Sequence, residues 1–361
     1  MRVLAISSYG GLGGSELATA DFIANRPDGV EVDVLLVTGG PMEELLDVPT
    51  RVVEGFDGRP GPRDVARFSR MLRPILREGR YDVVWAVASK AAMLAVPAAR
   101  LARVPLVWHK VDFAWDRRLT KPLAGASTGV IGVSNTVVDA LGPLRQRRFL
   151  GAVTPPGRLD RRVEPRFDPD RPTIGTVARV VPYKGIHHMV RAAAGLSAEF
   201  PALRLVIAGG TLPEYPDYED ELRVLADATG LGDRLELLGH VHDVASVYER
   251  LDVFLSATYL DDEGFGLEGL GLGILEASWA GVPVVVARAG GSVEAIDDGR
   301  TGTLVDDAEP GALAAATAPY LRDLELARRI GEAGREFARR KGVEPEVAGQ
   351  RLFSLLQRAI R

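Results

Sequence analysis

Two glutamates in a glycine-rich stretch have the type and spacing that most clearly suggest chemistry. Glu268 and Glu276 are eight positions apart within Asp262–Gly281, which reads DEGFGLEGLGLGILEASWAG and follows the apolar run VFLSA. Glycine this dense after a strand lets backbone N–H groups approach an anion, and a helix predicted over 273–280 would add its N-terminal amides. One carboxylate could meet a ligand from the loop and the other from the helix. The alternative is a glycine-rich connection with solvated carboxylates.

A pair of cations, Arg179 and Lys184, follows the strand predicted over 173–178. Arginine binds phosphate oxygens through its planar fork and lysine acts as a point charge, so the pair could hold a diphosphate. Two solvated charges are the usual alternative for such a pair. Only five of the 44 basic residues of the chain are lysines, and this scarcity favours a specific use of Lys184.

Two further candidates follow strands predicted in the first half of the chain. The segment Ser8–Glu16, SYGGLGGSE, lacks the third glycine of a dinucleotide fingerprint and the Lys-Ser/Thr ending of a P-loop. It fits a loop that a ligand approaches closely, or glycines with a purely conformational role. His109 ends the strand predicted over 106–109, and a structural hydrogen bond is as consistent with it as a catalytic proton transfer.

Short β-branched runs alternate with longer Ala/Leu/Arg segments, and these elements must position the candidates. The predicted strands cover 3–7, 32–37, 83–87, 106–109, 129–133, 173–178, 203–208, 235–238, 253–256, 282–287 and 302–305. This alternation predicts the α/β class, with doubly wound parallel sheets and helices on both faces. Ligands of such sheets bind beyond the carboxyl ends of the strands, where the candidate residues stand.

The length of 361 residues corresponds to two domains at about 100–200 residues each. We expect a first domain over 1–157, a linker over 158–172, a second domain over 173–340 and a C-terminal amphipathic helix over 341–361. The linker is rich in Pro, Arg and Asp, which predicts an exposed segment. The C-terminal helix needs a surface to pack on, and the first domain is one such surface.

Composition excludes several classes of protein. The chain has no cysteine, which excludes disulfides, thiolate nucleophiles and Cys-ligated metals, and its net charge of −5 argues against a nucleic-acid partner. No apolar run reaches the roughly 18 residues of a membrane span, and the first residues resemble a strand, so we expect a cytoplasmic protein. Segment Arg63–Arg80 places several arginines near one helical face. Contact with an anionic membrane is the alternative to a solvated face, which we favour.

Taken together, these motifs resemble a retaining glycosyltransferase of family 4, whose GT-B architecture has two Rossmann-like domains facing across a cleft. The E-x7-E signature of that family matches Glu268–Glu276, and its Arg-x4-Lys-Gly element matches Arg179–Gly185. Its N-terminal Gly-Gly loop matches Gly10–Gly14, and its His-ending strand matches His109. The resemblance covers nearly the whole chain and is densest over 173–307.

The resemblance implies a role for each matched residue of the second half. Arg179 and Lys184 would pair with the diphosphate of a nucleotide-diphospho-sugar donor. Glu276 would accept hydrogen bonds from the ribose hydroxyls, and Glu268 would contact hydroxyls of the sugar. Backbone amides would hold the sugar and phosphate, and these are the amides of Leu270, Gly271 and Leu272.

In the first half, the resemblance implies that His109 sits over the donor sugar, and that Gly13 and Gly14 let the phosphate or the acceptor come close.

Two features depart from the family pattern. The segment TPPGRLD lacks the common Asn-Gly-Val-Asp ending. Glu263 begins a second EGFGL-like run, but the position eight further on is Gly271, so we reject it as the first glutamate of the signature.

The implied function is the transfer of a sugar, with retention of configuration, to a small molecule, a lipid or a saccharide. The resemblance implies no cofactor and no metal ion, and family frequency weakly favours a UDP-sugar over a GDP- or TDP-sugar. A GT-B enzyme of different chemistry, such as an epimerase or a pseudo-glycosyltransferase, is one alternative. A non-catalytic nucleotide-sugar-binding protein is another.

Overall fold

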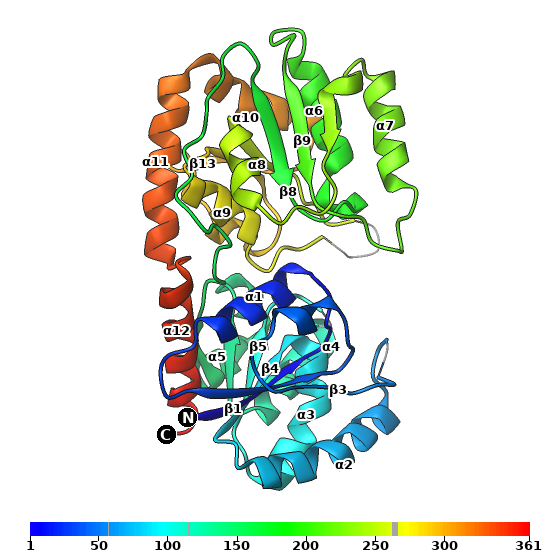
Figure 1. Cartoon of the computed structure of the whole chain (residues 1–361), viewed down its shortest axis with the longest axis vertical. Helices are drawn as coiled ribbons and strands as arrows, with labels where there is room; N and C mark the ends of the chain where they lie inside the picture. Colours follow the sequence, from blue (N-terminus) through cyan, green and yellow to red (C-terminus); the bar gives the residue numbers. More distant parts are fainter. Residues whose placement is uncertain (57, 115, 262–265) are drawn as a thin grey trace. The chain divides into compact units, whose positions relative to one another are not determined.

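Every strand pairing in the described part of the chain is parallel, and the strands form two separate sheets. The computed structural model describes residues 1–56, 58–114, 116–261 and 266–361. Each sheet belongs to its own unit of the chain (Figure 1). The first unit comprises Met1–Pro156 and Glu344–Arg361, and the second comprises Gly157–Val343. The predicted fold class, two Rossmann-like α/β units, is confirmed.

The described residues of the first unit form a seven-stranded sheet in the order β3-β2-β1-β4-β5-β6-β7. Its strands are β1 Arg2–Ser7, β2 Glu31–Leu36, β3 Thr50–Val52, β4 Val83–Val87, β5 Leu106–Lys110, β6 Gly129–Gly132 and β7 Phe149–Ala152. The central strand β4, VVWAV, is buried along its whole length. Helices cover both faces of a parallel sheet and exclude water from both. Its strands are therefore continuous apolar runs rather than alternating apolar and polar residues.

Two groups of helices cover this first sheet. Its helices are α1 Gly14–Ala24, α2 Pro62–Gly79, α3 Ala88–Ala102, α4 Asp116–Ala126, α5 Arg145–Arg148 and α12 Pro345–Arg358, with 3-10 turns η1 Pro41–Leu45 and η2 Thr136–Leu144. Helices α2 and α3 pack against each other, and α1 packs against α12. Proline at the first position of α2 and the Asp64 carboxylate, which accepts the Gly61 N–H at 2.9 Å, fix where α2 begins.

The C-terminal helix α12 belongs to the first unit. Its buried residues Leu352, Phe353 and Leu356 join the same apolar cluster as Phe22 of α1 and Trp85 of β4. A Cβ atom at Gly349 would lie 2.1 Å from the carbonyl oxygen of Asn25, so glycine is required for this close approach of α12 to the end of α1. The terminal segment therefore completes the core of the first unit.

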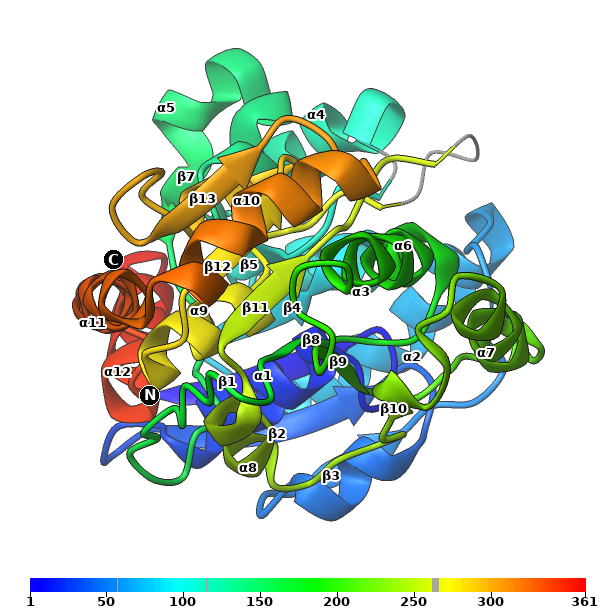
Figure 2. The ribbon, with the colours of Figure 1, turned by 90° about the horizontal axis from the view of Figure 1, so that it is seen from above.

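The described residues of the second unit form a six-stranded sheet in the order β10-β9-β8-β11-β12-β13. Its strands are β8 Thr173–Val177, β9 Arg204–Ala208, β10 Leu235–Leu237, β11 Val253–Ser256, β12 Val284–Ala287 and β13 Gly302–Val305. Its helices are α6 Ile186–Leu196, α7 Tyr218–Ala228, α8 Val244–Arg250, α9 Leu272–Ala280, α10 Pro310–Arg322 and α11 Leu324–Lys341, with 3-10 turns η3 Pro182–Lys184, η4 Gly232–Arg234 and η5 Gly291–Glu294. Figure 2 shows α6, α7 and α10 on one face of this sheet and α8 and α9 on the other.

The segment predicted as a linker, 158–172, has no helix or strand and is packed on the second unit. Leu159, Val163 and Phe167 are buried, and Arg335 of α11 donates to the Val163 carbonyl at 3.0 Å. The residues just before this segment, Thr154–Gly157, are also buried. Most of the other residues of 158–172 are exposed, as the composition predicts, while apolar residues spaced along the stretch anchor it to the second unit.

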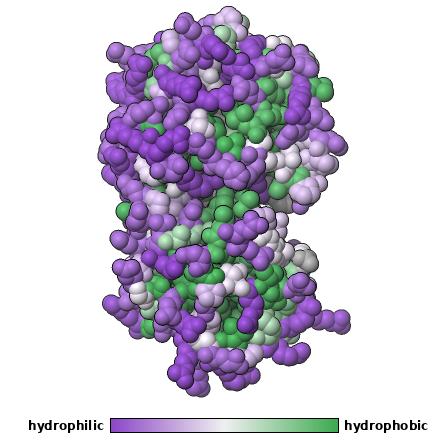
Figure 3. Space-filling model, in the orientation of Figure 1, coloured by the Kyte–Doolittle hydropathy of each residue, from purple (hydrophilic) through white to green (hydrophobic). Residues whose placement is uncertain are grey.

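Hydrophilic side chains cover much of the visible surface of each unit, and apolar areas lie between them (Figure 3). Large apolar side chains that are exposed include Tyr9, Leu45, Leu101, Val224 and Leu260. Within the described ranges, none of the helices combines the length and the apolarity that a crossing of the bilayer requires.

Candidate functional site

Lys184 stands in a tight loop that leaves β8 and enters α6. The loop turns through the 3-10 turn Pro182–Lys184, and Gly185 then adopts a left-handed conformation with φ +67°. A Cβ atom at Gly185 would lie 2.0 Å from the carbonyl oxygen of Ala257, which follows β11. Both the positive φ and the close contact therefore require glycine. Because Gly185 has no side chain, the Lys184 loop can pack against the loop after β11.

Glu268 lies in the segment that joins β11 to α9. Its backbone N–H donates to the Ala289 carbonyl at 3.3 Å, and its carbonyl accepts the Gly291 N–H at 2.7 Å. These two bonds tie Glu268 to the loop after β12. The Glu268 carboxylate accepts a hydrogen bond from the Thr258 hydroxyl at 2.9 Å. The loops after β11 and β12 therefore orient both the backbone and the side chain of Glu268.

The ammonium of Lys184 donates a hydrogen bond to the carboxylate of Glu268. Both side chains are 16% exposed, so the pair is largely withdrawn from water while still reaching the surface. Burial alone would raise the pKa of Glu268, but Lys184, the Thr258 hydroxyl and the more distant Arg179 together hold that pKa below its ordinary value. Glu268 is therefore ionised at neutral pH, and Arg179 is exposed beside it.

The N-terminus of α9 lies next to these charges. Gly271 is its N-cap in a left-handed conformation, φ +86°, and Leu270 before it is 5% exposed. A Cβ atom at Gly273 would lie 3.0 Å from the carbonyl oxygen of Val177, the last residue of β8. This close packing places the first amides of α9, from Leu272 on, beside the loop that carries Arg179. Helix amides and cations at one point favour a phosphate.

Glu276 lies one turn further into α9 and is completely buried. Its carboxylate accepts the backbone N–H of Arg158 at 3.0 Å and the Arg158 Nε–H at 3.1 Å, both on Oε1. Its Oε2 accepts the Tyr248 hydroxyl at 3.0 Å and Arg158 Nη2 at 3.4 Å. Burial and the nearby carboxylate raise the pKa of Tyr248 well above its ordinary value, so that hydroxyl stays protonated and donates.

In the first unit, His109 lies on β5 and is 2% exposed. Its Nδ1 accepts the Trp85 indole N–H at 3.3 Å, and the Phe22 ring lies with its centroid 6.0 Å from the imidazole. Burial lowers the pKa of His109 to about 4, so the ring is neutral at physiological pH. Its Nε2 is buried and makes no hydrogen bond within the described residues. His109 therefore has one ring nitrogen whose hydrogen-bonding capacity no described residue satisfies.

The glycine-rich loop after β1 combines one close contact with an open stretch. A Cβ atom at Gly10 would lie 2.8 Å from the backbone of Gly39 and Gly40, which follow β2, so Gly10 lets these two loops touch. A Cβ atom at Gly13 would meet only the movable end of Glu16, and one at Gly14 would meet nothing within 4 Å. Gly13 caps α1 and Gly14 begins it, so both line an open helix N-terminus.

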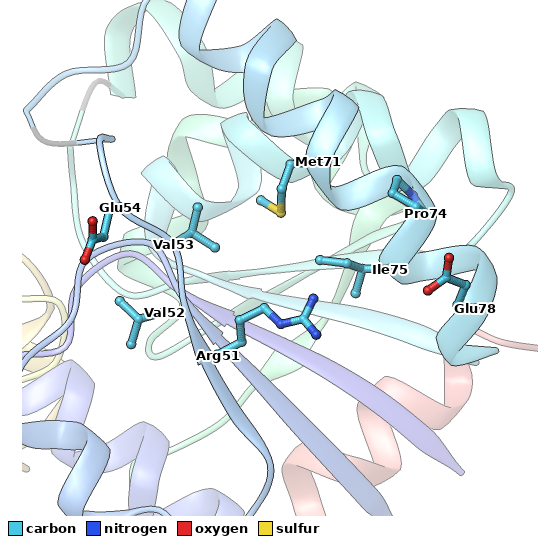
Figure 4. A pocket seen from close by; sticks show the side chains of 8 residues that line it. All are labelled: Arg51, Val52, Val53, Glu54, Met71, Pro74, Ile75 and Glu78. Atoms are coloured by element: carbon cyan, nitrogen blue, oxygen red, sulfur yellow. The ribbon is translucent and has the colours of Figure 1, made fainter.

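A groove of about 700 Å³ lies between β3 and α2 of the first unit (Figure 4). The residues that line it are Arg51, Val52, Val53, Glu54, Met71, Pro74, Ile75 and Glu78. On α2 itself, the buried residues are Phe68, Leu72 and Leu76, whereas the arginines of Arg63–Arg80 are exposed. Arginine on the side away from the core is typical of a solvated face.

The second unit brings together four of the predicted elements, namely Arg179, Lys184, Glu268 and the N-terminus of α9. The sequence analysis missed Thr258, Tyr248 and Arg158 as partners of the two glutamates. Arg158 stands in the TPPGRLD segment, whose departure from the family pattern was a signal. Glu263, rejected above, lies outside the described residues. No described group of three or more His, Asp or Glu side chains is arranged to hold a metal, and the expectation of metal-free transfer stays a prediction.

Two family profiles match the chain. The profile for glycosyl transferases group 1 matches residues 158–337, and the profile for Glycosyltransferase Family 4 matches residues 13–149. Together they cover most of both units.

Curated relatives include mannosyltransferases. The chain is 31% identical over 303 residues to the GDP-mannose-dependent alpha-(1-6)-phosphatidylinositol monomannoside mannosyltransferase of Mycobacterium tuberculosis, covering 77% of this chain and 75% of the relative. It is 35% identical over 164 residues to the lipopolysaccharide core biosynthesis mannosyltransferase LpcC of Rhizobium leguminosarum bv. viciae, covering 45% of each.

Among solved structures, Anabaena Alr3699/HepE in complex with UDP matches with a TM-score of 0.83 and 22% identity, covering 99% of this chain and all of that one. The lipopolysaccharide glycosyltransferase WaaG matches with a TM-score of 0.68 and 15% identity, covering 97% and 99% of the two chains. These likenesses establish the fold. With the family profiles and the mannosyltransferase relatives, they show that the chain belongs to glycosyltransferase family 4 and is a glycosyltransferase of the GT-B fold.

Proposed function

We propose that this glycosyltransferase moves mannose from GDP-mannose to a hydroxyl of a lipid-linked or saccharide acceptor, with retention of configuration. The observation that carries the donor site is the Lys184–Glu268 pair beside Arg179 and the N-terminus of α9. Cations and helix amides suit a diphosphate, and a carboxylate suits sugar hydroxyls. Both kinds of group stand within one loop cluster of the second unit.

The proposed chemistry follows from the charges that develop during transfer. Loss of the sugar places positive charge on its anomeric carbon and negative charge on the leaving diphosphate. Arg179, Lys184 and the first amides of α9 would stabilise the leaving group electrostatically. The leaving phosphate oxygen would take the proton of the acceptor hydroxyl on the same face of the sugar, which retains configuration without a protein nucleophile or a metal ion.

The remaining residues would position the donor. Glu268 would accept hydrogen bonds from hydroxyls of the sugar, and Glu276 from the ribose hydroxyls. The amides of Leu270, Gly271 and Leu272 would hold the sugar and phosphate. His109 would offer its neutral Nε2 to a sugar hydroxyl, and the open N-terminus of α1 at Gly13 and Gly14 would admit phosphate or acceptor.

The proposed donor is a GDP-sugar rather than the UDP-sugar that family frequency favours. The relative that matches three quarters of its length at 31% identity is named for GDP-mannose, whereas the UDP complexes belong to a protein of 22% identity. The names of the mannosyltransferase relatives also supply the acceptor class, because they specify a phosphatidylinositol mannoside and a lipopolysaccharide core.

Incubation of the purified chain with GDP-mannose and phosphatidylinositol mannosides or core oligosaccharides tests this proposal. We expect GDP release and a product whose new mannosyl linkage has the α configuration of the donor, read from its anomeric proton and carbon signals. A β-linked product would contradict retention. Release of GDP with an epimerised sugar and no acceptor product would contradict transfer and indicate an epimerase of the same fold.

A further inference from the structure

Arg158 has no role in the proposed binding of the donor, yet it makes three of the hydrogen bonds to Glu276. An ionised carboxylate has about four acceptor positions on its two oxygens. The Arg158 backbone, the Arg158 guanidinium and Tyr248 supply four donors to them. Glu276 is therefore saturated by protein groups, and ribose hydroxyls can bind it only by replacing one or more of these.

The donors differ in how readily they can leave. The Tyr248 side chain is completely buried. The Arg158 N–H is fixed by its neighbour Gly157, whose own N–H donates to the Val343 carbonyl at 2.8 Å and where a Cβ atom would lie 2.9 Å from the Trp279 ring. The Arg158 side chain is 28% exposed, so its guanidinium can move into water while the backbone bond stays in place.

Departure of the guanidinium frees one acceptor position on each carboxylate oxygen, since Nε bonds Oε1 and Nη2 bonds Oε2. Two neighbouring acceptors on one carboxylate match two O–H donors on adjacent carbons, which is what the 2′- and 3′-hydroxyls of ribose present. The planar fork of arginine and a vicinal diol can thus bind the same two acceptor positions of the Glu276 carboxylate.

We propose that the Arg158 guanidinium occupies the ribose-binding positions of Glu276 in the absence of donor and gives them up to the two ribose hydroxyls. This inference rests on the proposed role of Glu276 in binding the nucleotide. Arg158 is then a positioning residue that weakens the preference for ribose, because GDP must displace the guanidinium whereas a nucleotide without the two hydroxyls leaves it in place. Without the guanidinium, only the ribose hydroxyls would fill these two acceptor positions of the buried carboxylate, and an unsatisfied buried acceptor carries a large penalty.

Calorimetric titration with GDP and with 2′,3′-dideoxy-GDP tests this role, using the wild-type chain and Arg158→Met. Methionine keeps the apolar stem and the backbone N–H but cannot compete for the carboxylate. The preference for GDP is the Kd for 2′,3′-dideoxy-GDP divided by the Kd for GDP. We expect this ratio to rise about tenfold in Arg158→Met. Loss of one positive charge near the diphosphate affects both nucleotides alike and cancels in the ratio. An unchanged or smaller ratio would overturn the proposal.

Arg161→Met is the matched control, because Arg161 lies in the same segment and pairs with the carboxylates of Asp243, which is exposed, and Glu249, which is half-buried. It should leave the ratio unchanged, and a rise equal to that of Arg158→Met would contradict a specific role. If Arg158→Met does not fold, Arg158→Lys serves, since one ammonium cannot fill both positions and an intermediate rise is expected. A wild-type chain that binds neither GDP nor UDP refutes the donor site itself, whereas binding with an unchanged ratio refutes only the role of Arg158.

Discussion

The ammonium of Lys184 and the carboxylate of Glu268 bond to each other across 84 positions of sequence, and in doing so they join the loop after β8 to the segment before α9. Each residue satisfies the charge of the other while no ligand is bound. A diphosphate would compete for Lys184 and a sugar hydroxyl for Glu268, so a nucleotide-sugar would separate the pair and engage both halves at once.

Glu268→Gln should abolish most of the turnover and leave nucleotide binding nearly intact. The amide keeps the shape of the side chain, but it loses the charge that orients the donor sugar. We expect kcat to fall by about 100-fold or more, the scale of removing one electrostatic contact in a transition state, while the Kd for GDP changes by less than about threefold on the affinity scale. Steady-state transfer assays and calorimetry measure the two quantities. Turnover at the wild-type rate would remove Glu268 from the site.

Lys184→Ala should weaken nucleoside-diphosphate binding itself. A hydrogen bond to a charged group contributes about 1.5–3 kcal/mol, which corresponds to a rise in Kd of about 10- to 100-fold. Lys121→Ala is the control, because Lys121 is an exposed lysine on α4 of the first unit. Circular dichroism checks that each variant is folded. Equal affinities for GDP in Lys184→Ala, Lys121→Ala and the wild type would disprove the diphosphate contact.

His109 should make the first unit sensitive to acid. Its folded-state pKa is about 4 against an ordinary value of 6.5, so the unfolded chain binds a proton first as the pH falls. Stability is therefore fully present above pH 6.5 and is lost between pH 6.5 and 4, by about 3 kcal/mol at 1.36 kcal/mol per pKa unit. Urea unfolding from pH 7.5 to 4 should show this loss in the wild type and a shallower one in His109→Gln. Parallel curves for the two proteins would contradict it.

Gly185→Ala should disrupt the site through its backbone. A Cβ atom at this position meets the Ala257 carbonyl at 2.0 Å, and the residue also has φ +67°. Gly230→Ala is a matched control, since Gly230 has φ +75° with nothing within 4 Å of its Cβ position. We expect Gly185→Ala to lower the unfolding free energy by about 1–3 kcal/mol more than the control, and to weaken GDP binding. Equal losses in the two variants would show that the contact relaxes freely.

Much of the second unit could be predicted from the sequence, because its signals are local. The strand runs, Gly185 after Lys184 and the glycines around Glu268 each imply a specific backbone. The partners of the glutamates could not be predicted, since Arg158 and Glu276 are 118 positions apart and only the folded chain joins them. The linker was predicted only in part, for a related reason. Its Pro, Arg and Asp content indicates exposure, whereas the isolated apolar residues Leu159, Val163 and Phe167 anchor it.

The most direct test of the donor site is calorimetric titration of the wild-type chain with GDP, UDP and TDP, each in the presence of a chelator. The proposed site predicts that GDP binds most tightly and that the chelator leaves its affinity unchanged, because Lys184, Arg179 and the amides of α9 supply the positive charge. Binding of no nucleoside diphosphate, or binding that requires a divalent cation, would contradict the proposed donor site.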